Sequence, residues 1–221
     1  MNKKKVLVLA LAVCLLAILS FSTLAWFTDF DEVTNQFHVA TSTEEPDDIF
    51  SIDVQEQVDT DGDGVADAII DEGKVDDGFH YENIYPSAEL VKAPKAVNTG
   101  KYDQYVRMHV TVDEAWDALV NGDLNATLKG LDTAKWTFAG KTVEGGKVTY
   151  TYYLNRVLPH SDVENTGCET LFTHVVIPET LTQEDMAALT DGMFTMDIVA
   201  EAVQADNTGD NAQDAFALVM P

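Results

Sequence analysis

Apolar and polar residues alternate with a period of two along much of this chain, and this alternation restricts its fold more than any other feature. Across Tyr105–Val112 the even-numbered positions are apolar, whereas Arg107 and His109 are among the odd-numbered ones. Such a segment presents one apolar face as a half-buried β-strand. The same pattern predicts strands over Phe50–Gln55, Val148–Leu154, Phe172–Ile177 and Phe194–Val203. Trp136–Phe138 and Lys141–Val143 are predicted to form a hairpin around Ala139-Gly140.

Helical signals are short and lie between the predicted strands. Asp113 is a candidate N-cap for Glu114–Val120, Thr182 is one for Gln183–Leu189, and Gln213–Val219 reads as a final helical turn or two. Many strands interrupted by a few short helices are typical of a sandwich of two sheets. We therefore expect an all-β protein, a jelly-roll-like β-sandwich with a few short helices.

The N-terminus carries the parts of a secretory signal peptide. Three lysines at Lys3–Lys5 precede the apolar run Val6–Phe21, and Thr23 and Ala25 provide the small residues that a signal peptidase reads. We expect residues 1–25 to be the signal peptide, with cleavage between Ala25 and Trp26. The apolar run is also long enough for an uncleaved membrane anchor, which is the competing interpretation. Either way, the remaining chain is expected to be extracellular or at the cell surface.

The charge of the chain narrows the range of partners. The formal net charge is −25, and residues 1–25 contain three lysines and no acidic residue, so the exported part is more negative still. Such a surface repels nucleic acids and anionic lipids, and leaves the signal segment as the expected membrane contact. Cys168 is the only cysteine beyond the signal peptide, so no internal disulfide is expected there. The stability of the exported domain must therefore come from core packing, a bound metal or assembly.

An acidic insertion loop around residues 57–80 contains the sharpest local motif. Alternating aspartates on a tight loop place hard oxygen ligands around one point, an arrangement that Ca²⁺ prefers. The candidate ligands are Asp59, Asp61, Asp63 and Asp67, with Asp71 as a late ligand. The twelfth position, where an EF-hand has Glu, is Ile70. The ordinary alternative is a solvated acidic turn between two strands.

Residues 26–40 form a separate amphipathic segment, followed by the sandwich domain at 41–221. Val33, Phe37 and Val39 share one face of this segment when it is extended. A strand freed at its N-terminus by cleavage can pair with an exposed sheet edge. If the segment enters its own sheet, the protein is a closed monomer. If it enters a neighbouring copy as a donor strand, head-to-tail addition yields a filament.

Several short motifs resemble one family of exported proteins. They are Trp26-Phe27-Thr28-Asp29 after the small residues, Lys92-Ala93-Pro94-Lys95-Ala96-Val97-Asn98-Thr99-Gly100, and Tyr105-Val106-Arg107. These are similar to the TasA/camelysin-like proteins, which a SipW-type signal peptidase processes. Trp26 stands where that family usually has Tyr or Phe, and Ser87 replaces the usual Gly after Pro86. The resemblance implies a jelly-roll protein of the biofilm matrix or surface that forms fibres.

Catalytic signals are weak by comparison. Camelysin-type proteins are described as metallopeptidases, so the resemblance also implies that enzyme class. The five histidines are scattered over the sequence and form no zinc-binding motif. Trp136, Tyr150 and Tyr152 could form a carbohydrate-binding face or ordinary core. We therefore expect a secreted structural protein rather than an enzyme, with a calcium-dependent surface binding or adhesion module as the alternative and a camelysin-like metalloprotease as the second.

Overall fold

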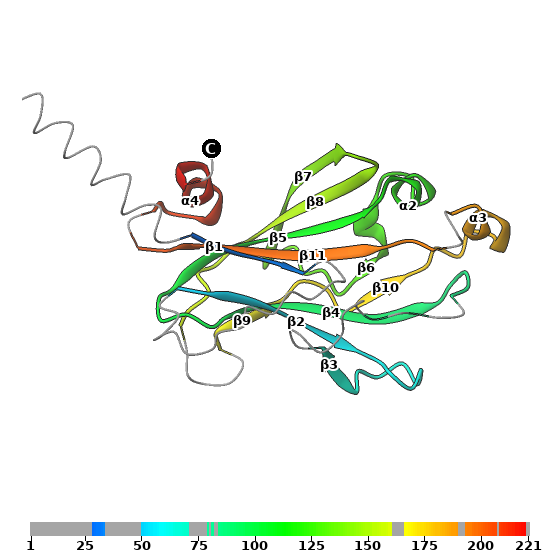
Figure 1. Cartoon of the computed structure of the whole chain (residues 1–221), viewed down its shortest axis with the longest axis horizontal. Coiled ribbons are helices and arrows are strands. Elements are labelled where there is room, and N and C mark those ends of the chain that lie inside the picture. Colours follow the sequence, from blue (N-terminus) through cyan, green and yellow to red (C-terminus); the bar gives the residue numbers. More distant parts are fainter. Residues whose placement is uncertain are drawn as a thin grey trace, which may run out of the picture.

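Two antiparallel β-sheets packed face to face make up the body of this computed structural model (Figure 1). It describes residues 28–33, 50–70, 79, 81, 84–160, 166–189, 193–206 and 208–219. The predicted signal peptide and its cleavage point at Ala25 and Trp26 lie outside these ranges. Within them, no helix has the length and apolar character needed to cross a membrane.

The first sheet has the strand order β1-β11-β5-β8-β7. Its strands are β1 (Thr28–Val33), β11 (Met196–Gln204), β5 (Gln104–Asp113), β8 (Lys147–Leu154) and β7 (Trp136–Glu144). β5 and β8 fall where the period-two alternation predicts them. The first and last described strands, β1 and β11, are therefore neighbours in this sheet.

The second sheet has the order β3-β2-β4-β10-β6, and β9 pairs with β4 beside this path. Its strands are β3 (Ala68–Ile70), β2 (Ile52–Val58), β4 (Glu89–Asn98), β10 (His174–Val176), β6 (Leu128–Lys129) and β9 (Cys168–Thr170). Every pairing in both sheets is antiparallel. The predicted all-β sandwich with a few short helices is confirmed.

The predicted hairpin around Ala139-Gly140 is wrong. Residues 136–144 form one continuous strand, β7, whose register against β8 shifts between Phe138 and Gly140. The glycine that suggested a turn instead belongs to a β-bulge, which inserts one extra residue without reversing the chain. The reversal comes at Gly145-Gly146, where φ is 59° and 81°. Two successive residues with positive φ suit a tight two-residue hairpin.

The short helices lie at the expected places, but one cap differs from the prediction. α3 (Gln183–Ala187) begins with a capping box between Thr182 and Asp185, and α4 is Ala212–Val219. α2 (Glu114–Leu119) follows Asp113, whose side chain makes no capping hydrogen bond. Its carboxylate instead accepts from the Thr195 backbone N–H at 2.7 Å, and so connects β5 to the residue before β11. A short 3₁₀ helix, η1, covers Leu124–Thr127.

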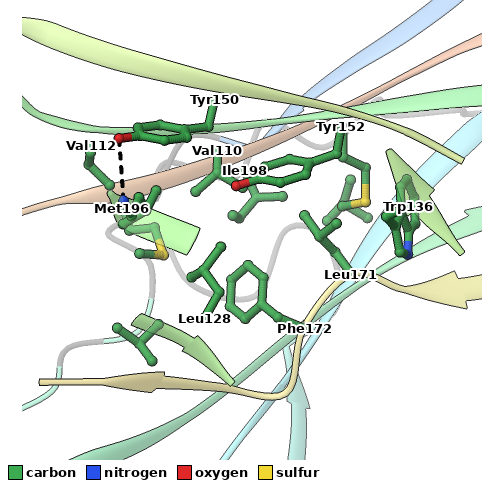
Figure 2. Packing of buried hydrophobic residues seen from close by; sticks show 14 of the residues in the cluster. Val110, Val112, Leu128, Trp136, Tyr150, Tyr152, Leu171, Phe172, Met196 and Ile198 are labelled. Atoms are coloured by element: carbon green, nitrogen blue, oxygen red, sulfur yellow. Dashed lines mark hydrogen bonds between the residues drawn. The ribbon is translucent and has the colours of Figure 1, made fainter. Parts of the chain in front are cut away.

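The core fills the space between the inner faces of the sheets (Figure 2). Trp136, Tyr150 and Tyr152 are at most 1 % exposed and point into it, so the carbohydrate-face interpretation of these residues is wrong. Phe172 and Leu171, which lie between β9 and β10, pack against them from the second sheet and are fully buried. The Tyr152 hydroxyl reaches the Asn125 side chain at 2.6 Å, which satisfies its buried polar end.

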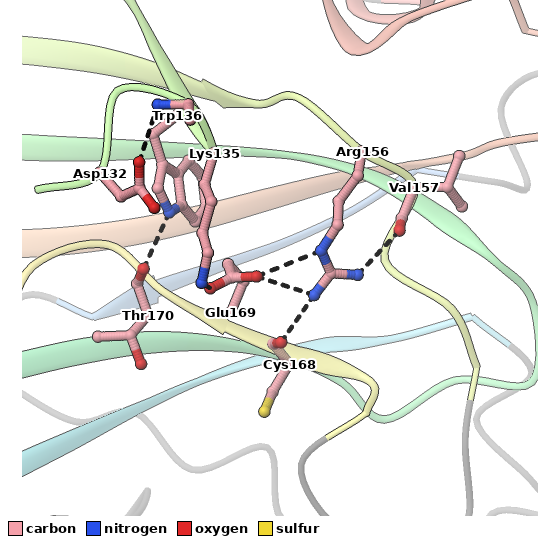
Figure 3. Close-up of polar contacts among 9 residues, drawn as sticks. Asp132, Lys135, Trp136, Arg156, Val157, Cys168, Glu169 and Thr170 are labelled. Atoms are coloured by element: carbon pink, nitrogen blue, oxygen red, sulfur yellow. Dashed lines mark hydrogen bonds and ion pairs between the residues drawn. The ribbon is translucent and has the colours of Figure 1, made fainter.

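An ion-pair cluster joins the two sheets where β7 begins and β8 ends (Figure 3). Glu169 of β9 lies 2.8 Å from the Lys135 ammonium and 3.0 Å from the Arg156 guanidinium. Beside it, the Trp136 indole N–H donates to the Thr170 carbonyl at 2.9 Å. Residues on either side of the β7–β8 hairpin are therefore fastened to the facing sheet by hydrogen bonds as well as by packing.

Replacing Phe172 with Ala should destabilise the domain by ~3–5 kcal/mol, because it removes a large ring from a closed core and leaves a cavity. Phe138→Ala is the matched control: this ring is 42 % exposed and contacts Tyr150 and Tyr152 from the sheet edge. Its loss should cost only ~1 kcal/mol. Denaturant unfolding of both variants measures the difference, and equal costs would contradict this assignment of the core.

Candidate functional site

The predicted acidic motif forms the loop of a hairpin between β2 and β3. Val58 pairs with Ala68 at its base, and the Asp67 backbone N–H donates to the Val58 carbonyl at 3.0 Å. Residues 60–67 are exposed to solvent. The loop is therefore an ordered turn that projects from the edge of the second sheet.

Asp59 organises the first half of this loop. Its carboxylate accepts hydrogen bonds from the backbone N–H groups of Asp61, Gly62 and Gly64 at 3.2, 2.7 and 2.6 Å. Gly64 has φ 86°, a conformation that a residue with a side chain rarely adopts. The hydrogen bond from Gly64 is the main reason that the pKa of Asp59 is lowered. Backbone N–H groups thus provide part of the neutralisation that a cation would give.

Asp67 closes the other half of the loop. It accepts from the Thr60 hydroxyl at 2.7 Å and from the Thr60 backbone N–H at 2.9 Å. These bonds, the hydroxyl first, lower the pKa of Asp67. The role of Thr60 was not anticipated from the sequence, although a threonine between two aspartates is a recognisable turn-forming residue.

Three of the five predicted metal ligands come together. Oxygens of Asp59, Asp61 and Asp67 lie within 4.8 Å of one another. Asp63 lies outside this group, and its carboxylate accepts from the Val65 backbone N–H at 2.8 Å. Asp71 lies outside the described residues. The three grouped carboxylates are hard oxygen donors of the kind that Ca²⁺ binds, although Asp59 already accepts three backbone hydrogen bonds.

Of the predicted assembly residues, Val33 lies in β1, whereas Phe37 and Val39 fall outside the described part of the chain. β1 pairs with β11 over six residues, from Thr28 opposite Val203 to Val33 opposite Ile198. It occupies one end of the first sheet and lies beside β2 of the facing sheet. The N-terminal segment therefore supplies an edge strand to the sheet of its own chain.

The described histidines occupy three separate places. The His109 ring lies 3.0 Å from Glu201 and 2.9 Å from the Thr151 hydroxyl, on the outer face of the first sheet. His160 contacts the Gly100 carbonyl, and His174 lies beside the Thr173 hydroxyl. His38 and His80 are outside the described ranges. Over the described residues, the group of side chains able to hold a metal contains no histidine.

The polar cluster around His109 connects neighbouring elements of the fold. Arg107 contacts Glu201 and lies over the Phe216 ring of α4, with its guanidinium carbon 4.4 Å from the ring centre. Burial alone would raise the pKa of Glu201, but hydrogen bonds from His109 and Arg107 lower it to about 2. Glu201 therefore stays ionised at neutral pH and is paired with the Arg107 guanidinium on the outer face of the sheet.

Comparisons with known proteins leave the family open. No family model matches the chain, and neither the curated proteins nor the solved structures contain a match.

Replacing Thr60 with Val should raise the pKa of Asp67 back toward its ordinary value of 3.8, because the hydroxyl donor is lost. Because the pKa of Asp67 is lower in the folded than in the unfolded chain, its ionised form stabilises the fold at pH values above the unfolded-state pKa. This stabilisation is lost as the pH falls through the folded-state pKa of Asp67. NMR titration of the aspartate side chains measures the change. Asp185, whose lowered pKa depends on Thr182, should be unaffected and is the internal control.

Proposed function

We propose that this chain is an exported structural protein of the extracellular or biofilm matrix, or of the cell surface, that assembles by exchanging its N-terminal strand. A signal peptidase of SipW type would release Trp26 as the new N-terminus, as the resemblance to TasA/camelysin-like proteins implies. The observation that carries the proposal is the position of β1. It begins two residues after the predicted cleavage point and forms an edge strand of the first sheet.

The connection after β1 is long enough for exchange. Residues 34–51 separate β1 from β2, and an extended chain of that length spans ~60 Å. This exceeds the distance across a domain of this size, so β1 can reach the sheet of an adjacent copy. The β1–β11 pairing would then be intermolecular with the same register. Because the donor and acceptor surfaces differ, such contacts continue without closing and produce a filament.

Locking β1 in its own sheet should prevent assembly. Glu32 and Val199 are directly opposite in the register, so Glu32→Cys with Val199→Cys in a Cys168→Ser background can form a disulfide between β1 and β11. After export, the oxidised protein should remain monomeric and the reduced protein should form filaments. Size-exclusion chromatography and electron microscopy provide the measurement.

The same pair of conditions separates the possible failures. Filaments from the fully oxidised protein would contradict strand exchange while leaving a structural role intact. Monomers under both conditions, together with monomeric wild-type protein, would contradict the structural assembly itself. Deleting residues 26–40 is the complementary variant and should also abolish filaments.

A calcium-dependent surface binding or adhesion module is the second candidate, favoured by the grouping of Asp59, Asp61 and Asp67. These residues would hold Ca²⁺, and backbone carbonyls and water would complete a shell of about 6–8 oxygens. The ion would neutralise the clustered carboxylates and stiffen the β2–β3 hairpin. Under this function the loop, rather than the N-terminal strand, would be the surface that a ligand meets.

Asp67→Asn should weaken Ca²⁺ binding at least tenfold, because it removes a charged ligand from the group. Asp63→Asn in the same loop is the matched control and should have a smaller effect, since Asp63 lies outside the group. Isothermal titration with CaCl₂ measures both variants. Equal losses, or wild-type protein without binding at millimolar Ca²⁺, would contradict this site.

A further inference from the structure

A lysine and a glutamate face each other inside the sandwich, beneath the acidic hairpin. Glu56 belongs to β2 and Lys92 to β4, which are neighbouring strands. In the register Lys92 is opposite Val58 and Glu56 is opposite Pro94, so the two side chains are diagonal neighbours on one face. The Lys92 side chain is only 6 % exposed, and the Glu56 side chain only 5 %. Alternation along β2 places Glu56 on the same inner face as Ile52, Val54 and Val58.

The pair is close but poorly solvated. The Lys92 Nζ lies 2.6 Å from the Glu56 Oε1, and within the described part of the chain this is the one hydrogen bond that either side chain makes. Moving two opposite charges out of water is costly, even when they are paired and hydrogen-bonded to each other.

A half-buried tyrosine, Tyr81, lies close to this pair. Tyr81, whose hydroxyl donates to the Val91 carbonyl at 2.5 Å, has a raised pKa, first because of burial and then because of the charges of Glu56 and Asp59. An uncharged linkage would suit this position better than two ions.

We propose that Lys92 and Glu56 become joined by an intramolecular amide bond that cross-links β2 to β4. Proton transfer along the 2.6 Å hydrogen bond converts the ammonium and carboxylate into an amine and a carboxylic acid. The Nζ lone pair attacks the Glu56 Cδ, and the Nζ–Cδ bond forms as the Cδ–OH bond breaks. The hydroxyl leaves with one amine proton as water. No oxidant or other reactant is consumed, and an amide N–H and C=O replace the two buried charges.

Proximity favours this condensation. The fold holds both groups on adjacent strands, so no translational freedom is lost when they react. The product would constrain the unfolded chain between residues 56 and 92, as a disulfide does in chains that contain two cysteines. The described part of this chain has one cysteine, Cys168, and it is free.

Mass spectrometry of the denatured full chain tests the proposal. The wild-type protein should be lighter than its sequence by one water, after the N-terminus found in the same sample is taken into account. Trypsin should fail to cleave after Lys92, and the digest should contain Val75–Lys95 joined to the peptide that carries Glu56. Lys129 is the internal control, because its ion pair with Glu89 is about half exposed. Cleavage after Lys129 should be complete.

Lys92→Arg keeps the positive charge but removes the amine that reacts. This variant should have its full sequence mass, and the branched peptide should be absent. Its thermal unfolding should occur at a lower temperature than that of the wild-type protein, and unfolding should be more readily completed in denaturant. Wild-type protein of full sequence mass, with ordinary cleavage after Lys92, would overturn the proposal, because the pair would then be an ion pair only.

Discussion

Burial of two inner sheet faces against each other is the interaction on which the rest of this structure depends. Trp136, Tyr150 and Tyr152 enter the core from the first sheet, and Leu171 and Phe172 meet them from the second. Apolar burial of this kind supplies most of the favourable free energy of folding. Because the described part of the chain contains no disulfide, the acidic loop and the N-terminal edge strand both rely on this packing for their positions.

Electrostatics act on a sandwich already formed by packing. Acidic residues greatly outnumber basic ones, and several of the few cations are placed where they hold two elements together. Glu169 joins Lys135 and Arg156 across the sheets, and Glu201 joins Arg107 and His109 on adjacent strands. In the exposed β2–β3 loop, backbone N–H groups take over this function for Asp59. The protein therefore balances its acids locally while its surface remains strongly negative.

The sequence predicted local structure better than sheet arrangement. Alternation located β5 and β8 because one face of each strand is buried, and Thr182 was found because capping is a local interaction. Strand order was not predictable, since it depends on pairing between distant segments. Gly140 was misread because a glycine suits both a bulge and a turn. Three of the proposed metal ligands meet, whereas Glu56 was overlooked despite standing on an otherwise apolar strand face.

The β-bulge at Ala139 makes the two edges of the first sheet different, because it lies in the edge strand β7 and not in the opposite edge strand β1. An edge strand with a β-bulge and a nearby lysine is a poor template for pairing with another strand. Natural proteins use such edge strands to prevent aggregation. Lys141 is held there by Asp117. The opposite margin of this sheet is formed by β1. A filament assembled through this sheet would therefore be polar, because only one of the two sheet edges would accept a strand from another molecule.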